Sequence, residues 1–320
     1  MILQPGYRPP VYLRNGHLQT ILPALFRKIK EVKYSREDII ISDGDYLELD
    51  WVKNGNSKLA ILSHGLEGSS KANHILGMSA HLSKNGFDVL AWNFRGCGGT
   101  INKNLRFYHG GASDDLDEVI GHAIKEGYPE IYLVGFSMGA NITLKYLGEK
   151  ASVAYQNIKG AVAISAPCDL KGAAVKLEKK VNGIYLRRFL RSLKEKIILK
   201  EQRIPGSFDL SLLAGIKDFH AFDDHFTAPL HGFKDADHYY YRSSALRFLK
   251  GISVPVLILN AADDPYLSPS CYPEEQAGEN EFITLEIPRW GGHVGFMHSG
   301  PNGLYYSEER ALQFLQECNS

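Results

Sequence analysis

The pentapeptide around Ser137 has the composition of a serine nucleophile site. Gly135-Phe136-Ser137-Met138-Gly139 directly follows an apolar run and directly precedes a stretch with helical character. A serine on such a sharp strand-to-helix turn has an exposed hydroxyl, and the small residues beside it let the strained backbone pass. The N-terminus of the following helix adds free N–H groups and positive potential. GxSxG also arises by chance in glycine-rich chains, so this context is what makes Ser137 the candidate nucleophile.

A serine hydroxyl needs a base to take its proton, and the base needs a third group to orient it. In enzymes that carry this elbow, the acid and then the base follow the serine along the chain. Asp263-Asp264-Pro265 follows the apolar run 254–260, at a strand end where such sites lie. Asp264 fits the acid role better because it precedes Pro265 and Pro269, and Asp263 remains the alternative, with a loop N-cap or Asx turn as the structural role of the other.

The candidate base is His293, one of twelve histidines in the chain. It lies in Gly291-Gly292-His293-Val294-Gly295, after the apolar run 282–287, with glycines on both sides. His298, five residues later, is the weaker alternative. The sequence therefore predicts a Ser137, Asp264 and His293 triad.

A third segment could supply the oxyanion hole. Ser63-His64-Gly65-Leu66-Glu67-Gly68 follows an apolar run at the position where this architecture has its second oxyanion donor. The tetrahedral intermediate needs two backbone N–H groups, which we assign to Leu66 and Met138. We expect the His64 ring to brace this loop rather than to contact substrate.

The candidate triad and oxyanion residues follow different apolar runs, so they can meet only if those runs are strands of one sheet whose ends lie side by side. Near-continuous apolar runs alternate with helical periods, which indicates a mainly parallel sheet buried on both faces. The predicted strands are 59–63, 87–93, 131–135, 160–165, 254–260 and 282–287, preceded by a hairpin of antiparallel edge strands, 38–42 and 46–52, around Asp43-Gly44-Asp45. The predicted helices are 18–26, 72–86, 112–127, 138–150 and 307–317.

The regular alternation stops between Pro167 and about Lys250, where an amphipathic stretch, 176–202, is rich in arginine and lysine. We expect an α/β-hydrolase fold with helices on both faces of the sheet, divided into an N-terminal arm (1–36), a core (37–166 and 251–320) and a helical cap insertion (167–250). Residues 185–190 and 238–241 could line an acyl pocket, although filling the core of the cap is the simpler expectation. The basic face with Arg187, Arg188, Arg191, Lys194 and Lys196 could touch anionic lipid headgroups, but a solvated helix face is favoured.

Taken together, these segments resemble the YheT-like branch of the α/β-hydrolases (AB hydrolase 4 family), a group of esterases found in bacteria and eukaryotes. The resemblance covers nearly the whole chain and includes 15–20 (NGHLQT), 64–68 (HGLEG), 93–99 (NFRGCGG), the elbow, 262–265 (ADDP) and 291–296 (GGHVGF). Ala140 stands where relatives often carry a second glycine. The resemblance implies hydrolysis of short or medium acyl esters or lipid-like esters, without metal or nucleotide cofactor. We expect the HLQT segment to pack the arm on the core, with a role in substrate binding as the alternative. Arg95 is expected to hold loops together rather than to bind substrate, and Cys97 to be a small buried residue.

Composition limits the partners. Lysine plus arginine equal aspartate plus glutamate at 36 each, so no net field favours nucleic acid or an anionic membrane. The four cysteines are far apart, which favours reduced thiols, and no stretch approaches the ~20 apolar residues of a membrane span. With no secretory signal pattern at the start, we expect a cytoplasmic serine esterase acting on small-molecule esters. A thioesterase, peptidase or acyltransferase with the same triad, or a binding protein without turnover, is the alternative.

Overall fold

The computed structural model describes the chain except residues 4–5, 30–31, 151–155, 301–302 and 319–320. In the described part, one sheet of nine strands has the order β1-β9-β8-β7-β6-β4-β5-β3-β2. The strands are β1 (Ile2–Leu3), β2 (Ser35–Ile40), β3 (Tyr46–Val52), β4 (Lys58–Ser63), β5 (Asp88–Asn93), β6 (Glu130–Phe136), β7 (Ile158–Ile164), β8 (Val256–Leu259) and β9 (Ile283–Glu286).

All six predicted apolar runs form strands of this sheet, β4 to β9, and all pairings among them are parallel. The hairpin prediction is also confirmed, because β2 pairs antiparallel with β3 and Gly44 takes the positive φ that the turn between them requires. One detail of it was wrong. β3 also pairs with β5, so β2 alone of the two is an edge strand.

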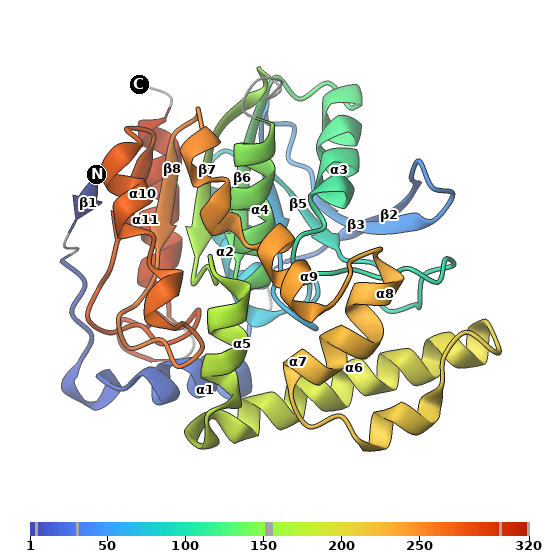
Figure 1. Cartoon of the computed structure of the whole chain (residues 1–320). Helices are drawn as coiled ribbons and strands as arrows, with labels where there is room; N and C mark the ends of the chain where they lie inside the picture. Colours follow the sequence, from blue (N-terminus) through green and yellow to red (C-terminus); the bar gives the residue numbers. More distant parts are fainter. Residues whose placement is uncertain (4–5, 30–31, 151–155, 301–302, 319–320) are drawn as a thin grey trace.

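Helices cover both faces of the sheet, as expected for this fold (Figure 1). Apolar side chains of α2 (Asn73–Lys84) and α11 (Tyr306–Glu317) pack on one face. Those of α3 (Ser113–Lys125), α4 (Met138–Glu149) and the short α10 (Glu274–Glu279) pack on the other. The two cores leave the carboxyl ends of the parallel strands at one edge, where polar loops meet.

Between β7 and β8 the chain forms helices only, and we call residues 167–250 the cap. Its helices are α5 (Leu170–Glu178), α6 (Gly183–Arg203), α7 (Phe219–Phe222), α8 (Ala228–Leu230) and α9 (Ala236–Ser243), and they enclose an aromatic core of their own. The predicted amphipathic stretch 176–202 is broken, because a 3-10 turn, Lys180–Asn182, separates α5 from α6. Asn182 makes this break by donating from Nδ2 to the Lys176 and Pro265 carbonyls.

The N-terminal arm runs from the sheet to the site. β1 pairs in parallel with β9, a pairing that the sequence did not predict. After a 3-10 turn, Val11–Leu13, the arm forms α1 (Gly16–Phe26), which starts where the Asn15 side chain accepts from the Leu18 N–H at 3.0 Å. No helix in the described ranges is long and apolar enough to cross a membrane.

Candidate active site

Ser137 lies on the turn between β6 and α4. Its φ is 54°, a left-handed conformation that is strained for a residue with a side chain. A Cβ on Gly135 would lie 2.5 Å from the Gly139 carbonyl oxygen, and one on Gly139 would lie 2.4 Å from the His64 oxygen. Both glycines of the pentapeptide are therefore required by close backbone packing, and the elbow conformation follows from the sequence.

The three residues of the expected triad come together in one hydrogen-bonded chain. His293 Nε2 lies 2.8 Å from Ser137 Oγ, and His293 Nδ1 lies 2.8 Å from Asp264 Oδ2. Because a carboxylate only accepts, the ring donates from Nδ1 and its Nε2 is free to accept the serine proton. Asp264 and His293 are only 3% and 5% exposed, and the Tyr266 ring stacks on the imidazole at 4.0 Å. This arrangement can activate a serine hydroxyl.

The two alternative residues lie elsewhere. Asp263 Oδ1 accepts from the Gly292 N–H at 2.9 Å, so this carboxylate holds the His293 loop and does not face the ring. Burial raises the pKa of Asp263. His298 is exposed and pairs with Glu309. The structure thus brings Asp264 and His293, and neither Asp263 nor His298, to Ser137.

The loop after β4 lies against the candidate nucleophile. A Cβ on Gly65 would be 3.1 Å from Ser137 Cβ. The N–H groups of Leu66 and Met138 have no protein acceptor among the described residues, and Met138 is the first residue of α4, where helix N–H groups are free. Two free donors beside a serine can hold the oxygen of a tetrahedral intermediate.

His64 braces this loop, as the sequence analysis expected. Its Nε2 accepts from the Phe94 N–H at 3.1 Å, so its proton is on Nδ1, which contacts the Gly65 oxygen at 2.7 Å. Burial lowers the pKa of His64 to about 4, which keeps the ring neutral in this role.

Glu67 connects the same loop to the cap. Its carboxylate accepts from Lys196 Nζ at 2.7 Å and from Ser192 Oγ at 2.5 Å, both on α6, and from the Tyr108 hydroxyl. Burial acts to raise the pKa of Glu67, but the Lys196 ammonium and the hydrogen bonds from Lys196, Ser192 and Tyr108 together outweigh it, so the pKa is lowered. The assignment of Lys196 to a solvated basic face was therefore wrong, because its side chain is buried in an ion pair with Glu67 of the core.

Residues of the arm also reach the site, which the sequence analysis missed. Thr20 Oγ1 accepts from the His293 N–H at 2.9 Å and donates to the Gly16 carbonyl at 2.7 Å. A Cβ on Gly16 would lie 1.9 Å from the Asp263 oxygen, so α1 touches the loops of both the acid and the base. Gln19 and Thr20 of the HLQT segment are thus buried against the loop of His293, and Thr20 also lines a cavity beside Ser137. In the sequence, the only sign of this contact was the NGHLQT motif at residues 15–20.

Comparisons with known proteins identify the family of the chain. Residues 60–297 match the family model described as the alpha/beta hydrolase fold. The chain is an α/β-hydrolase. It is 32% identical over 292 residues to the protein of Escherichia coli (strain K12) named "Putative esterase YheT", covering 88% of this chain and 84% of that one. It is 30% identical over 324 residues to the human protein named "Phospholipase ABHD3", covering 97% and 78% respectively. Among solved structures, the esterase Pf2001 of Pyrococcus furiosus matches with a TM-score of 0.61 at 19% identity, over 91% of this chain and 92% of that one.

Two cavities of this α/β-hydrolase meet at Ser137 and His293. The first, of about 110 Å³, extends under the cap and has a mainly apolar wall that includes Leu66, Leu170, Leu177, Phe189, Phe219 and Phe222. The second, of about 440 Å³, lies between the arm and the cap and includes Thr20, Leu25, Lys71, Ile184, Tyr185 and Arg188. Tyr239 and Tyr240, expected to fill the cap core or to line a pocket, do both.

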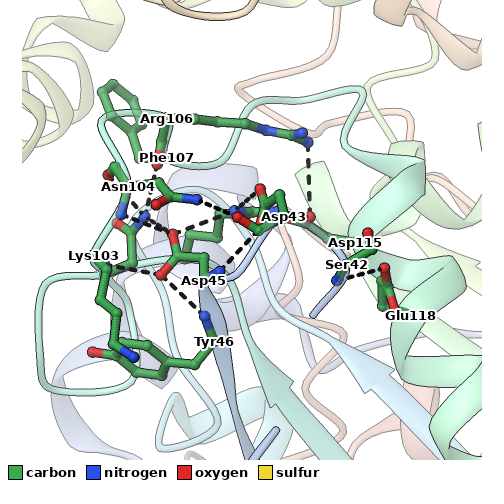
Figure 2. A network of polar contacts seen from close by, with 12 residues as sticks. Ser42, Asp43, Asp45, Tyr46, Lys103, Asn104, Arg106, Phe107, Asp115 and Glu118 are labelled. Carbon is green, nitrogen blue, oxygen red and sulfur yellow. Dashed lines mark hydrogen bonds and ion pairs between the residues drawn. The ribbon is translucent and has the colours of Figure 1, made fainter. Parts of the chain in front are cut away.

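A polar network fixes one wall of the first cavity. Arg95 is buried and binds Asp115 at 2.7 Å and Asp43 at 2.6 Å, which confirms that it holds loops together. Figure 2 shows how the neighbouring Asp45 accepts from the backbone N–H groups of Tyr46, Lys103 and Asn104. This network anchors the segment that leads to Phe107 and Tyr108 in the cavity wall.

Two further points concern thiols and metals. Cys97, expected to be buried, is only partly buried, and its Sγ lies 3.2 Å from Lys196 Nζ. Within the described ranges, no group of three or more histidine, cysteine or acidic side chains could hold a metal ion.

Proposed function

We propose that this α/β-hydrolase is a serine esterase that cleaves carboxylic esters through an acyl-enzyme, with Ser137 as nucleophile, His293 as base and Asp264 as its orienting acid. The observation that carries the proposal is the continuous chain of 2.8 Å contacts from Ser137 through His293 to Asp264, beside two free backbone donors.

In the proposed mechanism, Ser137 Oγ attacks the ester carbonyl while His293 Nε2 takes its proton. The negative charge that develops on the carbonyl oxygen is held by the Leu66 and Met138 N–H groups, and Asp264 stabilises the imidazolium. The imidazolium then gives its proton to the leaving alcohol, which leaves an acyl-enzyme. A water molecule, deprotonated by His293, attacks the acyl carbon, and the carboxylic acid is released as Ser137 regains its proton.

The two cavities suggest how a substrate is held. The apolar wall of the smaller cavity suits an acyl chain, and the larger, more polar cavity suits the alcohol part of the ester. The small volume of the first favours short or medium acyl chains. The relatives named as an esterase and a phospholipase support ester hydrolysis as the reaction class.

The test is hydrolysis of p-nitrophenyl esters, from acetate to palmitate, by the wild type and by Ser137→Ala. We expect activity on the shorter esters and its loss by at least about 10³-fold in the variant. Ser57→Ala is the control, since Ser57 is exposed in the loop before β4, at the opposite end of the strand from the site. A fluorophosphonate probe should label the wild type at Ser137. No labelling together with no ester hydrolysis would contradict the proposal.

A further inference from the structure

Exposed apolar side chains line the larger cavity or lie close along the chain to residues that do. Leu25 of the arm and Ile184 of the cap line that cavity, yet they are 67% and 64% exposed. Beside them, Phe26 is 54% exposed and Val181 is 69% exposed. Large apolar side chains scattered singly need no explanation, but a cluster of them around one opening indicates an interaction surface.

The arm and the cap that carry these side chains lie next to each other. The rings of His17 on α1 and Tyr185 on α6 are parallel at 5.9 Å, and His17 Nδ1 lies 3.0 Å from the Tyr185 hydroxyl. Asn182, next to Val181, donates to the Pro265 carbonyl in the loop of Asp264. In Figure 1, α1 (blue) and the start of α6 (yellow-green) accordingly lie together at the lower left. Leu25 and Ile184 line the same cavity from these two adjacent segments, and Phe26 and Val181 lie close to them along the chain.

The charge of this face is one-sided, although the whole chain is balanced at 36 basic and 36 acidic residues. Residues 179–194 contain six basic residues and no acidic one. The first 30 residues contain five basic residues and no acidic one, of which Arg27 is buried in an ion pair with Glu308. On the cap side, Lys179, Lys180, Arg187, Arg188 and Arg191 are all exposed. Arg191 pairs with Glu195, which belongs to the next turn of α6. The neutral total thus conceals a positive segment on the cap side of the cavity.

We propose that this face, built from Phe26 and its exposed neighbours on α1 and from residues 179–191 of the cap, docks on the surface of an anionic lipid bilayer. Apolar side chains beside basic ones are what such a surface binds, because the former enter the boundary of the acyl chains while the latter contact lipid phosphates. Docking places the mouth of the larger cavity against the bilayer. A lipid-like ester would then reach Ser137 without passing through water, a consequence that rests on the proposed function, whereas docking itself does not.

The experiment is flotation of the full chain with vesicles, carried out on Ser137→Ala so that hydrolysis cannot alter the lipid. We expect binding to phosphatidylcholine vesicles that contain about 30% phosphatidylglycerol, weaker binding to pure phosphatidylcholine, and weakening as salt is raised. In this background, Lys180→Gln with Arg187→Gln should weaken binding about 30-fold, since each basic side chain near the surface contributes about a factor of five. Phe26→Ser with Val181→Ser should weaken it about tenfold or more.

Matched controls separate the face from general charge and hydrophobicity. Lys125→Gln with Lys250→Gln removes the same charge from α3 and from the segment before β8, and Ile40→Ser removes an equally exposed apolar side chain from β2. These controls should bind as Ser137→Ala does. The same substitutions are also made in the chain that keeps Ser137. These variants should hydrolyse a soluble p-nitrophenyl ester at the wild-type rate, which shows that they fold. Failure of docking can then be told apart from failure of the proposed esterase function.

Three results would overturn docking on lipid. The first is binding with no preference for anionic vesicles. The second is an equal loss of vesicle binding in the controls and in the face variants. The third is an absence of vesicle binding together with self-association, seen in sedimentation velocity, that Phe26→Ser with Val181→Ser abolishes. The last would assign the face to a second copy of the chain.

Discussion

At the scale of single residues, two adjacent aspartates differ in role because different groups face them. Asp264 Oδ2 faces the imidazole, whereas Asp263 Oδ1 faces the Gly292 N–H. Asp264 Oδ1 also accepts from the Tyr266 N–H at 2.8 Å, so both of its oxygens are engaged and its direction is fixed. Asp264 therefore orients the His293 ring, whereas its neighbour Asp263 holds the loop that carries His293.

We expect Asp264→Asn to lower kcat for p-nitrophenyl esters by about 10⁴-fold, because an amide can favour the wrong tautomer of His293. Asp263→Asn keeps an oxygen for the Gly292 N–H and should lower kcat by less than about tenfold. Steady-state kinetics of the two variants, which have the same change in charge, check this. Equal losses would show that the acid role is not specific to Asp264.

Thr20 offers a second test at this scale, since it positions the base without touching a reacting atom. Thr20→Val removes the acceptor of the buried His293 N–H, and an unpaired buried donor costs about 1–3 kcal/mol. We expect kcat to fall about tenfold or more with little change in KM, and Thr20→Ser, which keeps the hydroxyl, to restore it. If Thr20→Ser lost as much as Thr20→Val, packing of the methyl group and not the hydrogen bond would explain the effect.

At the scale of elements, the cap and the candidate oxyanion loop are joined by one buried ion pair. Lys196 on α6 and Glu67 beside Leu66 are 7% and 8% exposed in their side chains and 2.7 Å apart. Glu67 also has a positive φ of 53°, and its N–H donates to the Tyr108 hydroxyl. The position of the Leu66 N–H therefore depends on a contact that the cap makes.

Lys196→Met should destabilise the protein by about 3–5 kcal/mol, because it leaves the Glu67 carboxylate buried without its cation. The double variant Glu67→Gln with Lys196→Met should recover part of that loss, because no uncompensated charge remains. Urea unfolding of the two single variants and the double variant measures the coupling. Additive losses would show that the two side chains are not coupled.

The sequence predicted those elements that are determined by residues close together in the chain. Strands β4 to β9 were predicted because a strand buried on both faces is a run of apolar residues. The elbow was predicted because the glycines that its backbone requires lie within the same pentapeptide. By contrast, β1 is a two-residue pairing with a strand at the other end of the chain, and the break between α5 and α6 depends on the Pro265 carbonyl. Thr20 was missed for the same reason, since its partner is 273 residues away.

At the scale of the whole molecule, folding holds several histidines in surroundings that disfavour their charged form. Burial lowers the pKa of His74, on α2, to about 3 and that of His64 to about 4. Such groups bind fewer protons in the folded state than in the unfolded state below pH ~6.5, so their contribution to stability is lost as the pH falls through that range. Asp223 in the cap acts in the opposite direction, because burial raises its pKa to about 6.

His74→Phe isolates one of these contributions. The His74 ring packs against Phe136 at 4.9 Å, and its Nε2 is buried without a partner among the described residues, so phenylalanine suits the site. Between pH 8 and pH 5, we expect the variant to lose about 2 kcal/mol less of its free energy of unfolding than the wild type. Urea unfolding at both pH values measures this difference. A wild-type loss equal to that of the variant would contradict a neutral, buried His74.

The docking of α1 on the loops of Asp263 and His293 also has a consequence for how the protein is made. A ribosome releases the N-terminus first, so Thr20 emerges 273 residues before its partner His293. At ~5–20 residues per second, this interval lasts on the order of tens of seconds. Once Ser137 has emerged, it can be on its turn while the base is still missing and α1 lacks the loop on which it docks. If the proposed triad is the catalytic one, a nascent chain is inactive until the loop of His293, which follows β9, is in place.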